Sequence, residues 1–386
     1  MVNRVCVVLV DRANFGRMHP VMNEIKRDPS LELQVLCAGT MLLERFGHTA
    51  SEVENAGFRI DARVFLEVEG STPITMAKSV GLGVIEFTSA FQMLQPDLIL
   101  MIGDRFEAMA AVLAASYMNI RVAHIQGGEV SGSIDESTRH AITKFSHLHF
   151  PATSRSAQYI VAMGEDPAYV HCVGCPVGDY ITSLKPDLDP KIFLERSVGA
   201  PVMANEPYLL VLFHPITTTF SSQNNEVLQL LEALSELKVP TVWLWPNIDA
   251  GADAISKELR RFREVHRPDW LCFAKNFDPA TYQKILMKTA CAVGNSSSFV
   301  RDSTFSGTPV VLVGDRQQGR EIGANTIKCS TSKDDILLAV KSQLAHGRYP
   351  IENLYGDGTA SIQIVEHIKN FARPHQKILC YPGVEN

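Results

Sequence analysis

The feature that most constrains the fold of this chain is a regular alternation of short apolar runs and helical segments. In the first half, strands are predicted at Arg4–Val10, Leu33–Ala38, Phe58–Phe65, Leu98–Ile102, Val122–Ile125, Leu148–Pro151 and Tyr169–Val173. The helices predicted between them are one that begins near Arg17, then Met41–Ala56, Ile74–Leu94, Arg105 to about Tyr117, Glu136–Ser146 and Ser154–Met163. Buried strands separated by helices are typical of an α/β fold with a doubly wound parallel sheet.

A second series of the same kind follows after a change in composition. Residues 181–206 carry several prolines and mixed charge, which predicts a linker. Beyond it, strands are predicted at Tyr208–Phe213, Thr241–Trp245, Leu271–Ala274, Cys291–Val293 and Val310–Val313. The sequence therefore predicts two doubly wound, Rossmann-like domains, residues 1–180 and 207–358, that face each other across a cleft. A last helix, Ser361–Ala372 in the segment 359–386, is expected to pack back on the first domain.

Composition excludes several classes of protein. The 386 residues are 46% hydrophobic and 20% charged, with a net charge of −6, and no long basic run suits nucleic acid. The N-terminal apolar run Val5–Val10 is too short for the apolar region of a secretion signal, and no apolar run approaches the roughly 18 residues of a membrane span, so a cytoplasmic protein with no membrane partner is expected. An anionic ligand must then be held by local arginines.

The same reading argues against metals and redox cofactors. The eight cysteines are scattered, and the single pair Cys172 and Cys175 lacks the second pair or histidines of a zinc site, so reduced thiols and no metal are expected. The turn after the first strand, DRANFGRMHP, lacks the GxGxxG fingerprint, which counts against NAD or FAD. It offers Arg12 ahead of a helix instead, a fair site for an anion. No cofactor is predicted.

Polar side chains gather in one stretch, Gly103 to Lys144. Asp104 and Arg105 follow one predicted strand, and Gln126 and Glu129 follow the next. Ligands of open α/β sheets bind outside the carboxyl ends of the strands, where loops carry the reactive groups. Carboxylates beside arginines there predict acid/base work on an anionic substrate, and a helix-capping and salt-bridge cluster is the alternative.

The second half offers a site for phosphates. In GNSSSFVRD, Asn295 and three serines stand between a strand and a helix, so backbone N–H groups and hydroxyls can converge on phosphate oxygens. Asp302, one turn later, is placed to accept hydrogen bonds from a ribose diol. Arg316 follows the next strand, and His214 ends the first strand of this half, where it could neutralise a diphosphate or act as an acid. A serine-rich helix cap is the alternative. Together these parts predict an enzyme for a nucleotide diphospho-sugar.

These motifs resemble those of the UDP-N-acetylglucosamine 2-epimerases, in the hydrolysing branch of sialic-acid-type biosynthesis. The resemblance covers nearly the whole chain, and it is carried by GDRFEA at 103–108, GGEVSGSIDESTRHAITK at 127–144, HPITT at 214–218, WPNIDAG at 245–251, GNSSS at 294–298, GTPVVLVGDRQQGRE at 307–321 and YGDG at 355–358. It implies a glycosyltransferase-B-like fold and a homodimer or homotetramer.

The resemblance also implies site residues. The nucleotide site would use Arg12, Arg105, His214, Asn247, Phe277 through its backbone, Ser296, Ser297, Asp302 and Arg316, and Arg139 and His140 are added as substrate-binding residues. The catalytic carboxylates would be Asp104, position 126 and Asp135. This chain departs from the pattern in two places: position 126 is Gln126 where Glu is expected, and Asp302 stands where Glu is more usual. A carboxamide cannot exchange a proton at neutral pH.

The expected reaction explains the need for several acids. A base removes the proton at C2 of the sugar while the diphosphate leaves C1, and the 2-acetamidoglucal then gains water at C1 and a proton at C2 from the opposite face. Asp104 and Asp135 are expected to share these acid/base roles, while Gln126 and Glu129 orient the acetamido group. In the alternative assignment Glu129 replaces the missing acid.

Four alternatives stay open at this stage. The sugar is UDP-N-acetylglucosamine or a 2,4-diacetamido-6-deoxy relative of it. A non-hydrolysing epimerase would return UDP to the sugar after the same elimination. A glycosyltransferase on the same architecture would need an acceptor groove. A nucleotide-sugar sensor would bind the ligand without turning it over, which would explain why Gln126 stands where a catalytic acid is expected.

Overall fold

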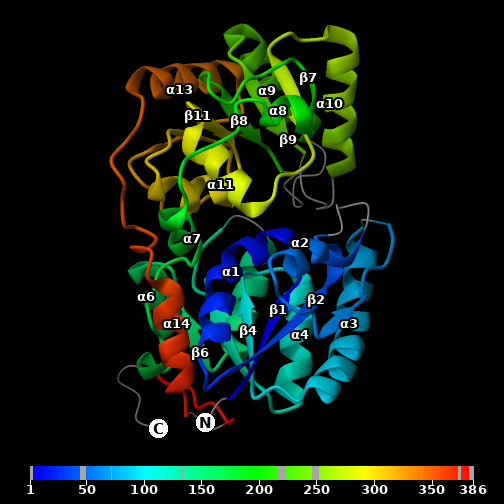
Figure 1. Cartoon of the computed structure of the whole chain (residues 1–386), viewed down its shortest axis with the longest axis vertical. Coiled ribbons are helices and arrows are strands. Elements are labelled where there is room, and N and C mark those ends of the chain that lie inside the picture. Colours follow the sequence, from blue (N-terminus) through cyan, green and yellow to red (C-terminus); the bar gives the residue numbers. More distant parts are fainter. Residues whose placement is uncertain are drawn as a thin grey trace. The chain divides into compact units, whose positions relative to one another are not determined.

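The computed structural model describes residues 3–43, 49–70, 72–131, 134–214, 223–245, 252–372 and 375–381. The chain divides into two compact units. Unit 1 comprises Met1–Val130, Asp135–Thr182 and Tyr355–Asn386, and unit 2 comprises Ser131–Ile134 and Ser183–Leu354. Each unit is built around its own sheet (Figure 1).

The sheet of unit 1 has the strand order β3-β2-β1-β4-β5-β6, and every pairing in it is parallel. Its strands are β1 (Arg4–Leu9), β2 (Glu32–Ala38), β3 (Ala62–Val64), β4 (Leu98–Ile102), β5 (Arg121–Ile125) and β6 (Leu148–Phe150). The helices along this part of the chain are α1 (Arg12–Arg27), α2 (Ala50–Asn55), α3 (Pro73–Leu94), α4 (Phe106–Tyr117), α5 (Ile134–Phe145), α6 (Ser154–Ala162), α7 (Val177–Ser183) and α14 (Ala360–Lys369), with short 3₁₀ turns η1 (Gly39–Leu42) and η3 (Pro167–Tyr169). This is the doubly wound order of a Rossmann fold.

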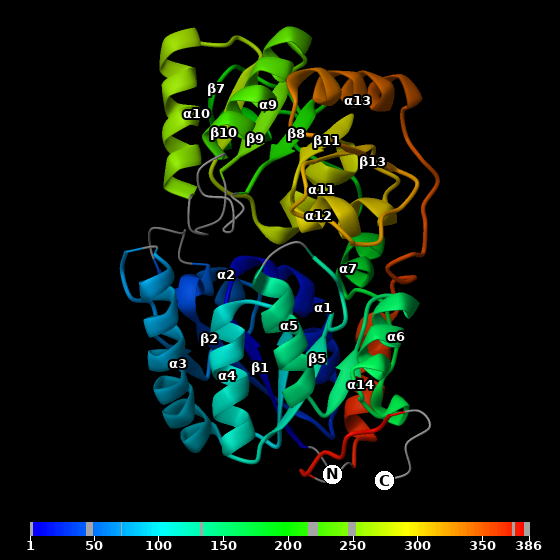
Figure 2. The same ribbon diagram turned by 180° about the vertical axis from the view of Figure 1, so that it is seen from behind.

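Helices cover both faces of this sheet, and the alternation along β1 shows how. Val5, Val7 and Leu9 lie in one core cluster with apolar residues of α1 and α14. The intervening residues, such as Cys6 and Val8, lie in a second cluster with residues of α3 and α4. Successive side chains of a strand point to opposite faces, so a strand that is apolar throughout must be buried on both. Figure 1 shows α1 and α14 on the near face, and Figure 2 shows α3, α4 and α5 on the other.

The sheet of unit 2 repeats this topology with one added strand. Its order is β13-β12-β11-β8-β9-β10-β7, parallel except for the antiparallel edge strand β7. The strands are β7 (Ser197–Gly199), β8 (Leu209–Leu212), β9 (Thr241–Leu244), β10 (Leu271–Ala274), β11 (Cys291–Gly294), β12 (Val310–Val313) and β13 (Thr326–Cys329). The helices are α8 (Ile192–Arg196), α9 (Gln223–Leu237), α10 (Ala252–His266), α11 (Pro279–Lys288), α12 (Ser297–Arg301), the 3₁₀ turn η4 (Asp302–Phe305) and α13 (Lys333–His346). Apolar residues of α9, α10 and α13 share one core cluster with this sheet.

Both sheets have a point where the strand order reverses. In unit 1 it lies between the neighbouring strands β1 and β4, and in unit 2 between β8 and β11. In doubly wound folds the loops after such a pair of strands run to opposite sides of the sheet, and ligands bind between them at the carboxyl ends of the strands. The polar residues of both halves of the sequence follow these strands.

Several local expectations were wrong. The first helix begins at Arg12 rather than near Arg17, because the Asp11 side chain caps it by accepting a hydrogen bond of 2.7 Å from Asn14 N. Within the described residues of the helix expected at Met41–Ala56, the structure has the 3₁₀ turn η1, an extended Leu43 and helix α2, and residues 44–48 lie outside the described ranges. The strand expected at Phe58–Phe65 is shortened to β3.

Three corrections concern the ends of the two series. Residues 169–173 form no strand, since only Val170 bridges to His149 there. The segment 181–206, expected as a linker, contains α8 and β7, and β7 pairs with β10 at the edge of the sheet. Strand β13 and helix α13 were missed, because residues of β13 are only partly buried and its pattern is weak. None of the helices within the described ranges is both long and apolar enough to cross a membrane.

Candidate functional site

At the switch point of unit 1, the Arg105 side chain is hydrogen-bonded to a buried carboxylate. Its Nε and Nη2 donate to the two oxygens of Glu107 at 3.1 and 3.0 Å, and Asp11 Oδ2 lies 3.8 Å from Nε. The Glu107 side chain is wholly buried, and burial raises its pKa to about 7 although Arg105 acts in the opposite direction. The Arg105 guanidinium is thus fixed along one edge and partly exposed, so it can bind an anionic ligand.

Asp104 lies next to a buried arginine. It follows Gly103, whose φ of +86° is a conformation that favours glycine. Arg139 of α5 donates from Nη2 to Asp104 Oδ2 and from Nη1 to the backbone oxygen of Glu129 at 2.6 Å. Arg139 is 1% exposed, and the Glu129 side chain is also buried. The structure therefore brings three predicted residues, Asp104, Glu129 and Arg139, together at one edge of the sheet, and commits much of Arg139 to holding the other two.

Gln126 is the least ordinary residue of this edge. It is 1% exposed and has a φ of +64°, which costs energy for a residue other than glycine. Its Oε1 accepts from Arg17 Nη1 at 2.7 Å, and its Nε2 donates to Cys175 Sγ at 2.8 Å. The amide thus links α1 to the segment before α7, and a sugar could use only the hydrogen-bonding positions that remain on each atom.

In unit 2 the switch point is closed by Asn295. Its Oδ1 accepts from His214 N at 2.7 Å and its Nδ2 donates to His214 O at 2.8 Å, so one side chain joins the ends of β8 and β11. Arg316 Nη1 donates to Asn295 O at 3.1 Å. Gly294, at φ +145°, allows this approach, because a Cβ there would lie 2.1 Å from Leu212 O. His214, Asn295 and Arg316 are therefore brought together.

The serines after Asn295 form the start of α12. Ser296 is its N-cap, and its Oγ lies 2.9 Å from Ser298 Oγ. Ser297 Oγ accepts from Arg301 Nη2 at 3.1 Å. Asp302, 5% exposed, accepts from Gln283 Nε2 at 2.8 Å. These hydroxyls and one carboxylate lie one turn apart beside a switch point, an arrangement that suits a nucleotide.

The remaining predicted residues are placed as follows. Asp135 is in the first turn of α5, and His140, further along, has Nε2 3.6 Å from Glu136 Oε1. Phe277 is buried edge-to-face against Phe193, with ring centroids 6.0 Å apart. Asn247, residues 215–218 of the HPITT motif and the Arg12 side chain lie outside the described part of the structure. Among the residues that are described, no group of three His, Cys, Asp or Glu side chains suits a metal ion.

Sequence reasoning missed the residues that act on other side chains. Arg17, Glu107, Cys175 and Gln283 each contact a predicted site residue. A weak signal existed for two of them, since Glu107 stands two positions after Arg105, and Arg17 lies in the turn region after the first strand. Cys175 and Gln283 are far in sequence from their partners, so no local pattern could have found them.

The chain has two doubly wound units, and polar residues gather at the switch point of each: arginines and acids in unit 1, and a serine-rich loop suited to phosphates in unit 2. This combination defines an α/β enzyme of the glycosyltransferase-B-like class. A UDP-N,N'-diacetylbacillosamine 2-epimerase (hydrolyzing) of Legionella pneumophila is 30% identical and aligns over 98% of both chains. A UDP-N-acetylglucosamine 2-epimerase of Neisseria meningitidis serogroup B is 28% identical over 95% of both chains. The solved UDP-GlcNAc 2-epimerase of Methanocaldococcus jannaschii in complex with UDP-GlcNAc and UDP superimposes with a TM-score of 0.79 over 95% of this chain and 100% of its own, at 13% identity, which shows the shared fold.

A sequence profile of UDP-N-acetylglucosamine 2-epimerases matches residues 23–369. The chain belongs to the UDP-N-acetylglucosamine 2-epimerase family, whose members act on nucleotide sugars.

Proposed function

We propose that this protein is a hydrolysing UDP-N-acetylglucosamine 2-epimerase, which converts UDP-N-acetylglucosamine and water to N-acetylmannosamine and UDP. The C2–H and C1–O bonds break first, with release of UDP and formation of 2-acetamidoglucal. Water then adds its oxygen at C1, and C2 gains a proton on the face opposite to the one it left. The free sugar would supply sialic-acid-type or surface polysaccharide biosynthesis.

The observation that carries the proposal is the convergence of Asp104, Glu129 and Arg139 at the carboxyl edge of the sheet of unit 1. The C2 proton of the sugar is not acidic, so its removal needs a carboxylate fixed in place. Arg139 is buried and hydrogen-bonded to Asp104, which holds that carboxylate in one orientation. A plain helix cap would not need a buried arginine beneath it.

In this proposal the residues of unit 2 bind the UDP. Ser296 and Ser297 offer hydroxyls to phosphate oxygens, Asp302 accepts from the ribose, and Arg316 and His214 compensate the charge on the departing diphosphate. Asn295 fixes His214 through two hydrogen bonds, at 2.7 and 2.8 Å. A group held in this way needs little reorganisation when the charge develops.

Asp104 and Asp135 are proposed to share the two proton transfers at C2. Gln126 cannot take part, and its bonds to Arg17 and Cys175 support a role in fixing Arg17 near the site. Glu129 is the alternative acid, because it is buried beside Arg139. Arg105, Arg12, Asn247 and Phe277 are proposed to contribute to binding of the nucleotide sugar.

Product analysis tests the reaction. The protein is incubated in D₂O with UDP-N-acetylglucosamine, and the products are read by NMR. Free N-acetylmannosamine with deuterium at C2, together with UDP, is the expected result. An epimerised nucleotide sugar would support the non-hydrolysing reaction instead, and tight UDP binding without turnover would support a sensor.

Substitution of Asp104 tests the assignment of the acid. Asp104→Asn should abolish deuterium exchange at C2 while UDP still binds. The control is Asp97→Asn, at the opposite end of β4, where Asp97 Oδ2 accepts from Arg4 N at 2.8 Å. Normal exchange in Asp104→Asn would transfer the role to Glu129 or Asp135, whose Gln and Asn variants then decide between them.

A second substrate stays open, because two relatives named for different sugars are almost equally similar to this chain. The Legionella relative, named for the diacetyl sugar, is 30% identical, against 28% for the Neisseria relative named for UDP-N-acetylglucosamine. A preference for UDP-2,4-diacetamido-2,4,6-trideoxyglucose would therefore place the protein in a legionaminic-type pathway. The same NMR assay with both substrates at equal concentration compares their kcat/KM values directly.

A further inference from the structure

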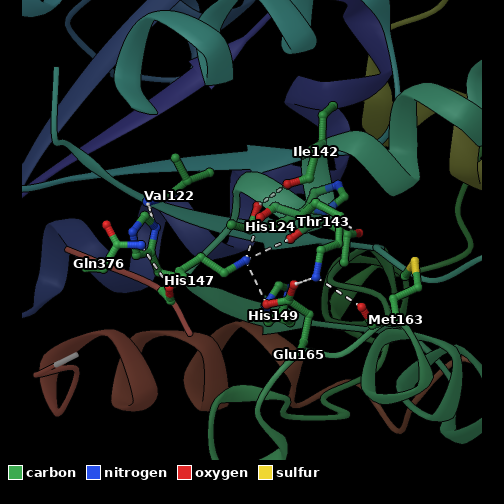
Figure 3. Close-up of polar contacts among 12 residues, drawn as sticks. Val122, His124, Ile142, Thr143, His147, His149, Met163, Glu165 and Gln376 are labelled. Carbon is green, nitrogen blue, oxygen red and sulfur yellow. Dashed lines mark hydrogen bonds and ion pairs between the residues drawn. The ribbon is translucent and has the colours of Figure 1, made fainter. Parts of the chain in front are cut away.

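A buried histidine lies directly behind the turn that carries Asp104. His124 of β5 is 0% exposed, and its Nε2 lies 2.7 Å from the backbone oxygen of Gly103. Its Nδ1 lies 3.4 Å from Thr143 Oγ1 on α5 (Figure 3). Thr143 Oγ1 also donates to Arg139 O at 3.0 Å. One imidazole thus contacts both the turn before Asp104 and the helix that carries Arg139.

The hydrogen bonds assign the proton on this ring. A carbonyl oxygen can only accept, so Nε2 carries the hydrogen and Nδ1 is left as an acceptor. The single hydroxyl hydrogen of Thr143 is then shared between Arg139 O at 3.0 Å and His124 Nδ1 at 3.4 Å. Burial lowers the pKa of His124 to about 4, so the ring is neutral near pH 7. Gly127 leaves room for the pair, because a Cβ there would lie 2.9 Å from both His124 Nδ1 and Thr143 Oγ1.

The turn held by His124 has little rigidity of its own. Gly103 has a φ of +86° and no side chain, and it joins β4 to Asp104. Strand β5 fixes it on both sides, since Gly103 N donates to Ile125 O at 3.2 Å and Gly103 O accepts from His124. Loss of the second bond would leave the Gly103–Asp104 peptide less restrained, and this peptide sets the direction in which the Asp104 side chain leaves the backbone toward Arg139.

We propose that His124 is a positioning residue that holds the Gly103–Asp104 turn in register with α5, and so fixes Asp104 relative to Asp135. The inference rests on the proposed function, because it takes both aspartates as the acids of the reaction. His124 contacts the backbone before Asp104 and the Thr143 side chain, and it acts on the chemistry through them.

The adjacent strand supplies a matched control. His149 of β6 is the register partner of His124 and is also 0% exposed. Its Nε2 lies 3.1 Å from Glu165 Oε2 (Figure 3). Glu165 also pairs with Lys144 and Lys377. Substitution of His149 removes an equally buried imidazole whose Nε2 contacts Glu165 rather than Gly103 O.

The experiment compares two variants at each histidine. Glutamine can place its Nε2 near the position of the histidine Nε2, whereas asparagine is too short to reach Gly103 O. His124→Asn should lower kcat for release of free sugar about 100-fold with KM changed less than about threefold, since a displacement near 1 Å can cost that much. His124→Gln should stay within about tenfold of the unsubstituted protein. His149→Asn should change kcat less than about threefold.

Several results would overturn the proposal. They are an unchanged kcat in His124→Asn, equal losses in the Gln and Asn variants, an equal loss in His149→Asn, or an effect confined to KM. If His124→Asn does not fold, as judged by circular dichroism and thermal melting, Thr143→Val takes its place: a lower kcat at constant KM supports the inference, and an unchanged kcat refutes it. If the unsubstituted protein turns over neither UDP-sugar, the proposed function itself fails, which is a separate outcome.

Discussion

Glu165 is a buried carboxylate of unit 1 that contacts two lysines and a histidine, and its substitution gives a sharp test of the physical reasoning. Its side chain is 1% exposed. Oε1 accepts from Lys144 Nζ at 2.7 Å, and Oε2 accepts from Lys377 Nζ at 2.7 Å and from His149 Nε2 at 3.1 Å. Lys377 also donates to Lys144 O at 2.7 Å, so it caps the end of α5. Glu165 thereby joins the C-terminal segment 375–381 to α5 and β6.

The magnitude follows from the pKa of this carboxyl. Burial alone would raise the pKa of Glu165, but hydrogen bonds from His149, Lys144 and Lys377 outweigh burial and lower it from 4.5 to about 2. A shift of about 2.5 units at 1.36 kcal/mol per unit corresponds to about 3 kcal/mol of stability at pH 7. Glu165→Gln should lose about this free energy of unfolding, or about 6–12 °C in the melting temperature of a unit of this size.

The dependence on pH has a definite sign. The ionised form is favoured in the folded state, so the stabilisation is complete above the unfolded pKa of 4.5 and is lost as the pH falls toward 2. Urea unfolding of both proteins at pH 7 and pH 4 measures this. The free energies of unfolding of the unsubstituted protein and of Glu165→Gln should differ by about 0.8 kcal/mol less at pH 4 than at pH 7. The change is small because Glu165 is still ionised in the folded state at pH 4, and only the unfolded chain has begun to bind the proton.

An exposed ion pair in the same unit supplies the control. Arg63 Nη2 lies 2.5 Å from Glu54 Oε1, with side chains 43% and 50% exposed. Glu54→Gln should cost less than about 1 kcal/mol, because exposed pairs gain little over hydration. A loss below about 1 kcal/mol in Glu165→Gln at pH 7, or a loss equal to that of Glu54→Gln, would refute the argument from burial and pKa.

Three further predictions follow from the site. Glu107→Gln should raise the free energy of unfolding at pH 8 by up to about 3 kcal/mol and leave it unchanged at pH 4, as thermal melting at both pH values can measure. The reason is that the pKa of Glu107 is raised from 4.5 to about 7 in the folded protein, so ionisation at high pH destabilises the folded state. UDP-sugar binding should weaken as Arg105 loses its partner. Asn295→Ala removes two buried hydrogen bonds to the backbone of His214 and should cost about 2–4 kcal/mol in urea unfolding of unit 2, with weaker UDP binding; a cost below about 1 kcal/mol would contradict the geometry. EDTA should leave turnover unchanged, because arginines neutralise the diphosphate, and a loss restored by Mg²⁺ would contradict this.

The accuracy of the sequence predictions depended on how local the underlying signal was. The ends of strands such as β4 and β8 were predicted within about a residue. Each strand is a run of four or five buried apolar residues, flanked by residues that end or begin a helix. The short strand β7 and the partly buried β13 were missed, since an edge strand is identified by its partner and carries little pattern. Asp104, His214 and Asn295 could be selected as site candidates because each directly follows a central strand.

The sequence by itself determined the α/β class and the polar residues at the ends of the central strands, because both depend on periodicity and on residue chemistry over a few positions. Its motifs also determined the family. Only the tertiary structure decided how those residues are held. Arg139 donates a hydrogen bond to Asp104, and the side chain of Gln126 is hydrogen-bonded to Arg17 and Cys175. His124 is hydrogen-bonded to Gly103 O in the turn before Asp104. These contacts join residues 21 to 109 positions apart in the sequence. Which donor meets which acceptor across such distances is set by strand register and helix docking, and no local pattern of residues records it.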